Sequence, residues 1–174
     1  MEFVFTLRYK LSDQDCDLDD IVERLGAAGC TDALVGLGQP GRLALKFTRE
    51  ADSAEAALTS ALADVKKAVA TAQLIEASPD LVGLTDVADL IGVTRQNMRK
   101  LWTTHALSFP PPIHEGSAAI WHLTEVLSWL QAKGTYRVQP ETLEVAAATM
   151  QVNMAKAVSQ VSPRIRREIR SFVE

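Results

Sequence analysis

The stretch LTDVADLIGVTRQNMRKLWTT, residues 84–104, decides how the middle of this chain folds. It predicts two short helices, the first of which begins after the N-cap Thr85. The inner face of that helix holds three residues: Val87, Ala88 and Ile91. Gly92 interrupts the pattern where the chain must turn, because glycine adopts left-handed backbone angles at little cost. Thr94 then caps a second helix, so the stretch predicts a helix-turn-helix.

The second helix of this motif has one apolar stripe and a broad polar face. Met98, Leu101 and Trp102 recur at i, i+3 and i+4, and we therefore expect them to share the buried side. The other faces hold side chains of the kind that pair with base edges and phosphates in a major groove: Thr94, Arg95, Gln96, Asn97, Arg99, Lys100 and Thr103. We interpret this set as DNA contacts, and the alternative is an ordinary helical hairpin with a solvated face.

The following segment, SFPPPIHEGSAAIWHLTEVLSWL (residues 108–130), predicts a β-hairpin and then a helix. Its prolines cannot continue a helix, because each removes a backbone donor and fixes φ. Short extended pieces flank Gly116 at the tip of the hairpin, and His114 and Ser117 lie beside that tip. Thr124 is the expected N-cap of the helix, which we expect to end at Gly134.

Taken together, these features resemble a known module, the winged helix-turn-helix of AlpA-like regulators and phage excisionases within the MerR superfamily. The matching features are the helix-turn-helix, Phe109-Pro110 with Pro112, Gly116, Trp121, Glu125-Val126 and Trp129. The resemblance covers residues 84–131. It implies that the second helix enters the major groove and that the hairpin, or wing, reaches the DNA backbone or minor groove. His114 and Ser117 at the wing tip would then join the helix residues as DNA contacts.

Residues 1–79 predict a small α+β domain. Four strands are expected, over residues 3–11, 33–37, 43–47 and 72–77. Two helices are expected, over residues 18–25 and 54–70, the second opened by a capping box of Asp52 and Glu55. The order β-α-β-β-α-β is that of a ferredoxin-like domain, with two helices on one face of an antiparallel sheet. We assign this domain to the binding of a protein partner or a small effector.

Patterns that could indicate other chemistry in the first domain are interpreted as structural. The glycines of residues 36–41 spell G-x-G-x-x-G, but the next segment alternates as a strand, whereas a dinucleotide site requires a helix there. The acidic run of residues 13–20 lacks the central Gly and terminal Glu of a calcium loop. Cys16, Cys30 and the three histidines lack the spacing of metal ligands. We therefore expect no catalytic site, no metal and no cofactor.

Charge is distributed unevenly along the 174 residues, which have a formal net charge of −4. Residues 1–84 hold 8 Lys and Arg against 14 Asp and Glu, while residues 85–137 and residues 138–174 each hold 5 against 4. A single weakly basic module binds phosphates poorly, so tight DNA binding is expected to require a homo-oligomer.

Residues 138–174 predict a helical tail that begins near Pro140. Its apolar positions follow the 4-3-4-3-4 spacing of a coiled-coil seam: Leu143, Ala147, Met150, Met154, Ala157 and Val161. We expect this seam to pair copies of the chain, and the alternative is a helix packed across its own protein. After Pro163 a last short helix gathers four apolar residues on one face and four arginines around the other. Those arginines either contact phosphate or an acidic patch such as residues 13–20, or are solvated.

The sequence thus predicts three parts: a ferredoxin-like domain (1–79), a winged helix-turn-helix (80–137) and oligomerisation helices (138–174). No apolar run approaches the roughly 18–20 residues that span a bilayer, and the first residues lack signal-peptide features. We expect a cytoplasmic, nucleoid-associated transcriptional regulator, a repressor that binds double-stranded DNA without chemistry. The alternatives are an excisionase-type recombination directionality factor and a protein-interaction module of the antitoxin kind.

Overall fold

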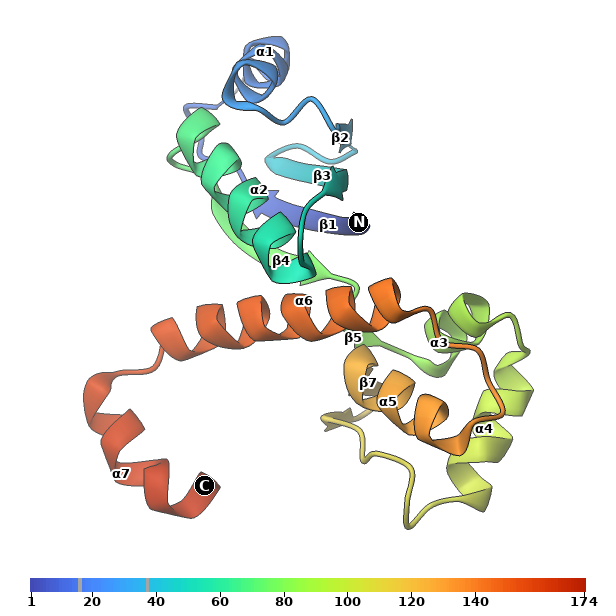
Figure 1. Cartoon of the computed structure of the whole chain (residues 1–174). Coiled ribbons are helices and arrows are strands. Elements are labelled where there is room, and N and C mark those ends of the chain that lie inside the picture. The colour runs from blue at the N-terminus through green and yellow to red at the C-terminus, as the bar shows by residue number, and fades with distance from the viewer. Residues whose placement is uncertain (16, 37) are drawn as a thin grey trace.

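The computed structural model describes residues 1–15, 17–36 and 38–174, which form an α+β fold of antiparallel sheets and helices (Figure 1). The predicted end of a strand at Leu37 and the thiol of Cys16 lie outside the described residues. In the part of the chain that is described, no helix has both the length and the apolar character needed to cross a membrane.

A four-stranded sheet with two helices on one face forms the N-terminal part. Its elements are β1 (Glu2–Lys10), α1 (Leu18–Ala28), β2 (Ala33–Gly36), β3 (Arg42–Glu50), α2 (Ala54–Ala68) and β4 (Gln73–Ser78). The strand order is β2-β3-β1-β4 and each neighbouring pair is antiparallel. Strict alternation along β1 and β3 places Phe3, Phe5 and Phe47 on the buried face and leaves the opposite face exposed. The β-α-β-β-α-β order of elements agrees with the sequence prediction.

Two local predictions in this part have clear outcomes. The segment after Gly41 is strand β3, as its alternation predicted. The cap of α2 was predicted wrongly. Ser53, not Asp52, is its N-cap, and the Ser53 hydroxyl accepts a hydrogen bond from the backbone N–H of Ala56 at 3.1 Å. Both residues can cap a helix, and the cap lies one residue later than the sequence alone suggested.

The second part packs three helices against a small sheet. Its elements are β5 (Leu81–Val82), α3 (Leu84–Ile91), α4 (Arg95–Thr104), β6 (His114–Glu115), β7 (Ala119–His122) and α5 (Leu123–Lys133). The sheet has the order β5-β7-β6, and β5 was not expected from the sequence. The core of this part contains the fully buried side chains of Val87, Met98, Trp121 and Leu127.

Two of the helix starts in this part differ from the predictions. Gly83 is the N-cap of α3, and the carboxylate of Asp86 accepts a hydrogen bond from the Gly83 N–H at 2.8 Å, so Thr85 lies inside the helix. Similarly, α5 starts after His122 and not after Thr124. At the start of α3, the hydrogen bond from the Gly83 N–H to the Asp86 carboxylate takes the place of the cap that we expected from the Thr85 hydroxyl. The predicted end of α5 at Gly134 is confirmed, with φ at 70°.

The long helix α6 (Pro140–Ser159) joins the two parts instead of lying apart from them (Figure 1). Val145 and Ala148 belong to the core of the first part, and Ala146 belongs to the core of the second. The six predicted seam positions therefore do not form one free stripe. Leu143 packs against the second core, whereas Met154 and Ala157 are exposed. Helix α7 (Pro163–Val173) follows after a short turn.

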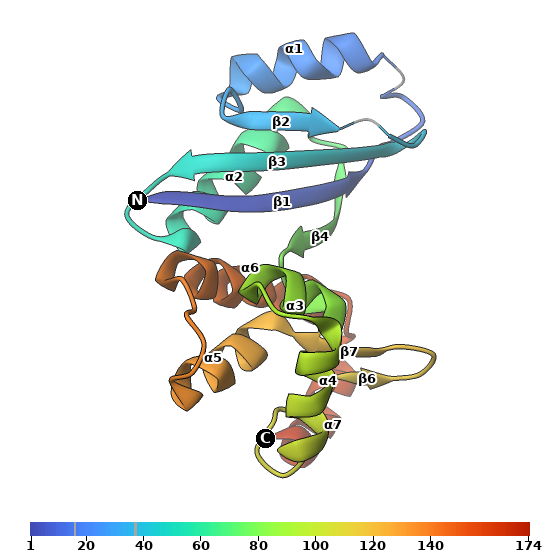
Figure 2. The ribbon, with the colours of Figure 1, turned by 90° about the vertical axis from the view of Figure 1, so that its right-hand side faces the viewer.

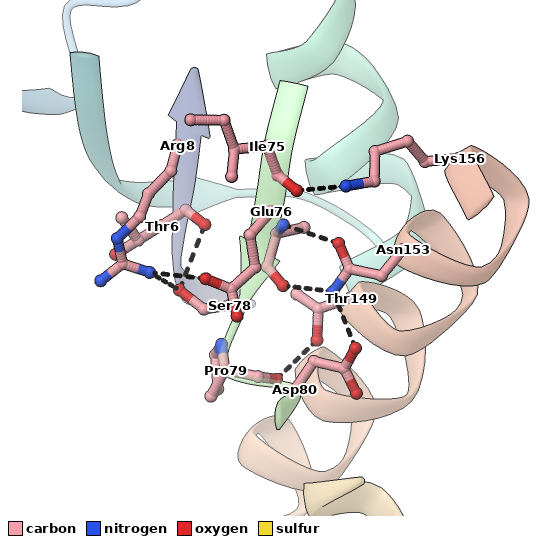
Figure 3. Close-up of polar contacts among 11 residues, drawn as sticks. Thr6, Arg8, Ile75, Glu76, Ser78, Pro79, Asp80, Thr149, Asn153 and Lys156 are labelled. Atoms are coloured by element: carbon pink, nitrogen blue, oxygen red, sulfur yellow. Dashed lines mark hydrogen bonds and ion pairs between the residues drawn. The ribbon is translucent and has the colours of Figure 1, made fainter. Parts of the chain in front are cut away.

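Polar side chains of α6 form hydrogen bonds with the backbone along β4, the edge strand of the first sheet (Figure 3). The Asn153 amide donates to the carbonyl of Ala77 at 2.7 Å and accepts from the Ala77 N–H at 2.8 Å. The same amide nitrogen donates to Asp80 at 2.7 Å, and Asp80 in turn contacts Nδ1 of His122 at 2.6 Å. Thr149 donates to the carbonyl of Pro79 at 2.6 Å. Asn153 thus pairs with the strand edge much as a neighbouring strand would.

Candidate nucleic-acid interface

The turn between α3 and α4 forms as the sequence predicted. Gly92 ends α3 with φ at 77°, and the Val93 N–H returns to the carbonyl of Ala88 at 2.9 Å. Thr94 caps α4, because its hydroxyl accepts a hydrogen bond from the Asn97 N–H at 3.2 Å. Met98 is fully buried and anchors α4 to the core. The orientation of α4 is therefore fixed at its first two turns.

All of the polar side chains that we predicted on α4 and at its cap lie on the surface. The exposed set is Thr94, Arg95, Gln96, Asn97, Arg99, Lys100 and Thr103. Since Met98 marks the buried side, the 100° spacing of the helix places Gln96, Lys100 and Thr103 nearest the centre of the opposite face. Helix α4 carries three cationic side chains and no carboxylate. Its outer face is therefore a run of hydrogen-bond donors and positive charge.

The wing lies beside one border of α4. A groove of about 520 Å³ separates Arg95 and Arg99 of α4 from the hairpin residues around Gly116. In Figure 2 the β6–β7 hairpin projects outward next to α4. A cationic border and a projecting hairpin therefore face the same groove.

His114 and Ser117 are both exposed at the wing tip, as predicted. A Cβ built at Gly116 would lie 2.7 Å from Nε2 of the exposed His114, so a larger residue there would require the His114 ring to turn away. Glu115 pairs with Ala119 across the hairpin and places one carboxylate at the tip. The base of the wing is held by β5, whose Val82 pairs with Trp121. The wing thus projects from a three-stranded base, which reduces its freedom to move relative to α4.

The other border of α4 faces Tyr136, a residue that the sequence analysis did not single out. The Tyr136 hydroxyl donates to the side-chain oxygen of Asn97 at 3.3 Å. Together with Gln96 and Lys100 these residues line a groove of about 470 Å³. Asn97 is therefore partly engaged by its own chain, unlike Gln96 at the centre of the face. The only sequence signal for this contact is that Tyr136 is an aromatic residue in the short connection between α5 and α6. The sequence does not show that this connection passes beside α4.

The three tryptophans pack at the centre of this part. Trp121 is fully buried, and its indole N–H donates to the carbonyl of Pro110 at 3.0 Å. Trp102 packs edge-on against Trp121, with ring centroids 5.0 Å apart. Trp129 contacts Phe109 at a centroid distance of 4.9 Å. These contacts fill the space between α4, α5 and the wing.

The groups with shifted pKa values lie in the first part of the chain, and burial, hydrogen bonds and neighbouring charges cause the shifts. Burial, and then the charge of Asp64, raise the pKa of the Cys30 thiol to about 11. Such a thiol is protonated near neutral pH and is not activated as a nucleophile. Among the described residues, no three His, Cys, Asp or Glu side chains are grouped as a metal site requires.

The surface around α4 therefore offers donors and cations at a protruding helix, a neighbouring wing and two flanking grooves. This arrangement can bind a polyanion of regular shape by hydrogen bonds and charge. Comparison of the chain with models of protein families, with curated proteins and with solved structures finds no match.

Proposed function

We propose that this protein is a transcriptional regulator that binds double-stranded DNA through a winged helix-turn-helix of the AlpA and excisionase kind. The observation that carries the proposal is the outer face of α4, which combines three cationic side chains with amide and hydroxyl groups and has no carboxylate. Buried Met98 holds this face outward. Helices presented in this way can enter a major groove.

The contacts divide by position on the module. Gln96, Arg99 and Lys100 lie where base edges would be reached, since they project from the exposed side of α4. His114 and Ser117 lie at the wing tip, where phosphates or the minor groove would be reached. Glu115 opposes phosphate contact at that tip, so the helix supplies most of the affinity.

The remaining parts of the proposal concern assembly and architecture. One module offers few cations, so we assign tight binding to a homo-oligomer acting in the cytoplasm on nucleoid DNA. The strand order β2-β3-β1-β4, with helices on one face, supports a ferredoxin-like first domain that receives a protein partner or small effector. Repression follows if the bound oligomer blocks access to the promoter.

The test begins with selection of the genomic fragments that the full chain retains at low salt. Removing a base contact by Gln96→Ala or Arg99→Ala is expected to weaken binding to a selected fragment by about 1–3 kcal/mol and to relax its sequence preference. Arg95→Ala is expected to behave similarly, and Asn97→Ala to cost less because Tyr136 already engages its amide. Electrophoretic retardation measures each affinity.

Lys67→Ala provides the matched control, because it removes an exposed cation on α2, far from α4. Its affinity for DNA should equal that of the parent. If Gln96→Ala and Arg99→Ala bound every fragment as tightly as the parent does, the assignment of α4 as the recognition helix would be wrong. Absence of retardation of any fragment by the parent at low salt would contradict DNA binding itself.

A further inference from the structure

The last helix, α7, exposes an apolar face that its own chain does not cover. Every residue of α7 is exposed. Ile165, Ile169, Phe172 and Val173 recur at i, i+4, i+7 and i+8 and so share one face of the helix. Phe172 is 85% exposed and Val173 is 72% exposed. A continuous apolar face of this kind marks an interaction site.

A row of arginines borders that face. Arg166 and Arg170 each follow one residue after Ile165 and Ile169, so they form the adjacent row along the helix. Over its whole length α7 carries four arginines and one glutamate. The partner surface should therefore be apolar with a row of carboxylates beside it.

Helix α1 has a surface of this description. Leu18 and Val22 are exposed at i and i+4, with relative exposures of 40% and 42%. Gly26 continues the same row, and a Cβ built there would meet no atom within 4 Å, so another helix can approach closely. Asp19 and Glu23 form the adjacent row, one residue after Leu18 and Val22. The order of the two rows is the same on α1 and α7.

The shared order of rows fixes the relative direction of the two helices. In each helix the charged row follows the apolar row by one residue. When two right-handed helices pack antiparallel through their apolar rows, both charged rows therefore lie on the same side of the contact. Arg166 then lies beside Glu23 and Arg170 beside Asp19. In the parallel direction the charged rows fall on opposite sides, so charge favours the antiparallel arrangement.

Within one chain these helices lie far apart. Figures 1 and 2 both place α1 and α7 at opposite ends of the molecule, with α6 between them. We propose that α7 of one copy packs antiparallel on α1 of a second copy, and that the second copy returns the same contact. A reciprocal exchange closes as a two-fold dimer and covers Ile165 and Ile169 of both copies.

The test uses two oppositely charged variants of the full chain. One carries Arg166→Glu with Arg170→Glu on α7, and the other carries Asp19→Lys with Glu23→Lys on α1. Each variant alone places like charges across both contacts, so its dimer dissociation constant should rise by at least about tenfold. In an equimolar mixture, a hybrid dimer has matched charges at both contacts. Sedimentation equilibrium should therefore show two-chain species for the parent and the mixture, and single chains for each variant alone.

Two controls separate the contact from general effects of charge. Arg167→Glu reverses an arginine on the side of α7 opposite Ile165, and Glu50→Lys reverses an exposed carboxylate on β3. Both should sediment as the parent does. A monomeric parent, an α1 variant that remains dimeric or a mixture that fails to associate would each overturn the proposal. These masses are measured without DNA, so they do not depend on whether the protein binds it.

Discussion

Arg49 is a buried charge on which three elements of the first domain converge. Its guanidinium makes a two-pronged contact with Asp32, at 2.7 and 3.0 Å, and also donates to Asp64 at 2.8 Å. Ser60 accepts a further hydrogen bond at 3.0 Å, and the group stacks over the ring of Phe47 at 4.9 Å. The side chain links β3 to α2 and to the turn before β2.

Replacing Arg49 with Met should destabilise the protein. Methionine fills part of the volume but leaves Asp32 and Asp64 without their cation. Because these carboxylates keep 28% and 29% of their side-chain surface in solvent, the loss should be about 1–3 kcal/mol, below that of a fully buried pair. Urea denaturation followed by circular dichroism measures the change in unfolding free energy. Arg42→Met is the matched control, because Arg42 is exposed on the same strand and its loss should change stability by less than about 0.5 kcal/mol.

The same contact makes stability depend on pH in the acidic range. Hydrogen bonding to Arg49 lowers the pKa of Asp32 from its usual range, although burial opposes the shift. A carboxyl whose pKa is lower in the folded state stabilises the fold above its unfolded pKa of about 3.9, and that stabilisation is lost as pH falls through the folded value. The difference in unfolding free energy between the parent and Arg49→Met should therefore be constant from pH 7 to 5 and shrink below about pH 4. A difference that stayed constant down to pH 3 would assign the loss to packing alone.

At the scale of single elements, local signals predicted α3, α4 and their turn. Gly92 and Thr94 act within one helical turn of themselves, so their roles could be inferred without knowing the rest of the fold. Strand β5 contains two residues, too few for any periodicity, and it exists because β7 lies beside it. The caps of α2, α3 and α5 were misplaced by one or two residues. Ser53 caps α2 in place of its polar neighbour, whereas Gly83 and His122 make no side-chain cap that a sequence pattern could indicate.

The buried face of helix α6 could not be predicted from the sequence. Alanine and other small residues lie on several sides of it, so the stripe through Met150 and Met154 and the stripe through Val145 and Thr149 were both plausible. Tertiary contacts decide between them, because Thr149 is fully buried and bonds to Pro79, while Met154 is 45% exposed. The intramolecular alternative thus describes most of α6. Pairing between copies through its exposed end stays a prediction.

The edge contact of α6 can be tested through Asn153. Asn153→Ala removes the partner of both backbone groups of Ala77 and should cost about 1–3 kcal/mol. Hydrogen exchange at the Ala77 amide should accelerate in the variant, since its acceptor is lost. Gln151→Ala, at an exposed position of the same helix, should leave that exchange rate unchanged. Equal rates in both variants would mean that α6 does not protect the β4 edge.

At the scale of the whole molecule, the sequence analysis did not predict how the parts of the chain are connected. The junction depends on Asp80, which is 1% exposed and bonds to both Asn153 and His122. His122 lies 42 positions after Asp80 in the sequence, and Asn153 lies 73 positions after it, so no local pattern relates the three residues. The apparent linker between two domains is therefore a buried contact point for three segments.

This connection determines which truncation can test oligomer formation. Removal of residues 138–174 deletes Val145, Ala146 and Ala148 from the two cores and exposes the edge of β4. That chain should lose the cooperative thermal transition of the parent in scanning calorimetry, whatever its oligomeric state. Removal of residues 162–174 deletes only α7, every residue of which is exposed, so the transition temperature should change little.

The shorter deletion should therefore separate assembly from folding. We expect the chain of residues 1–161 to sediment as a monomer and to bind a selected DNA fragment at least about tenfold more weakly, because two linked modules gain avidity that one module lacks. If it remained a dimer with unchanged affinity, the exposed end of α6 around Met154 would be the pairing surface instead of α7. If the chain of residues 1–137 melted cooperatively at the parent's temperature, α6 would be an appendage and the two cores would be complete without it.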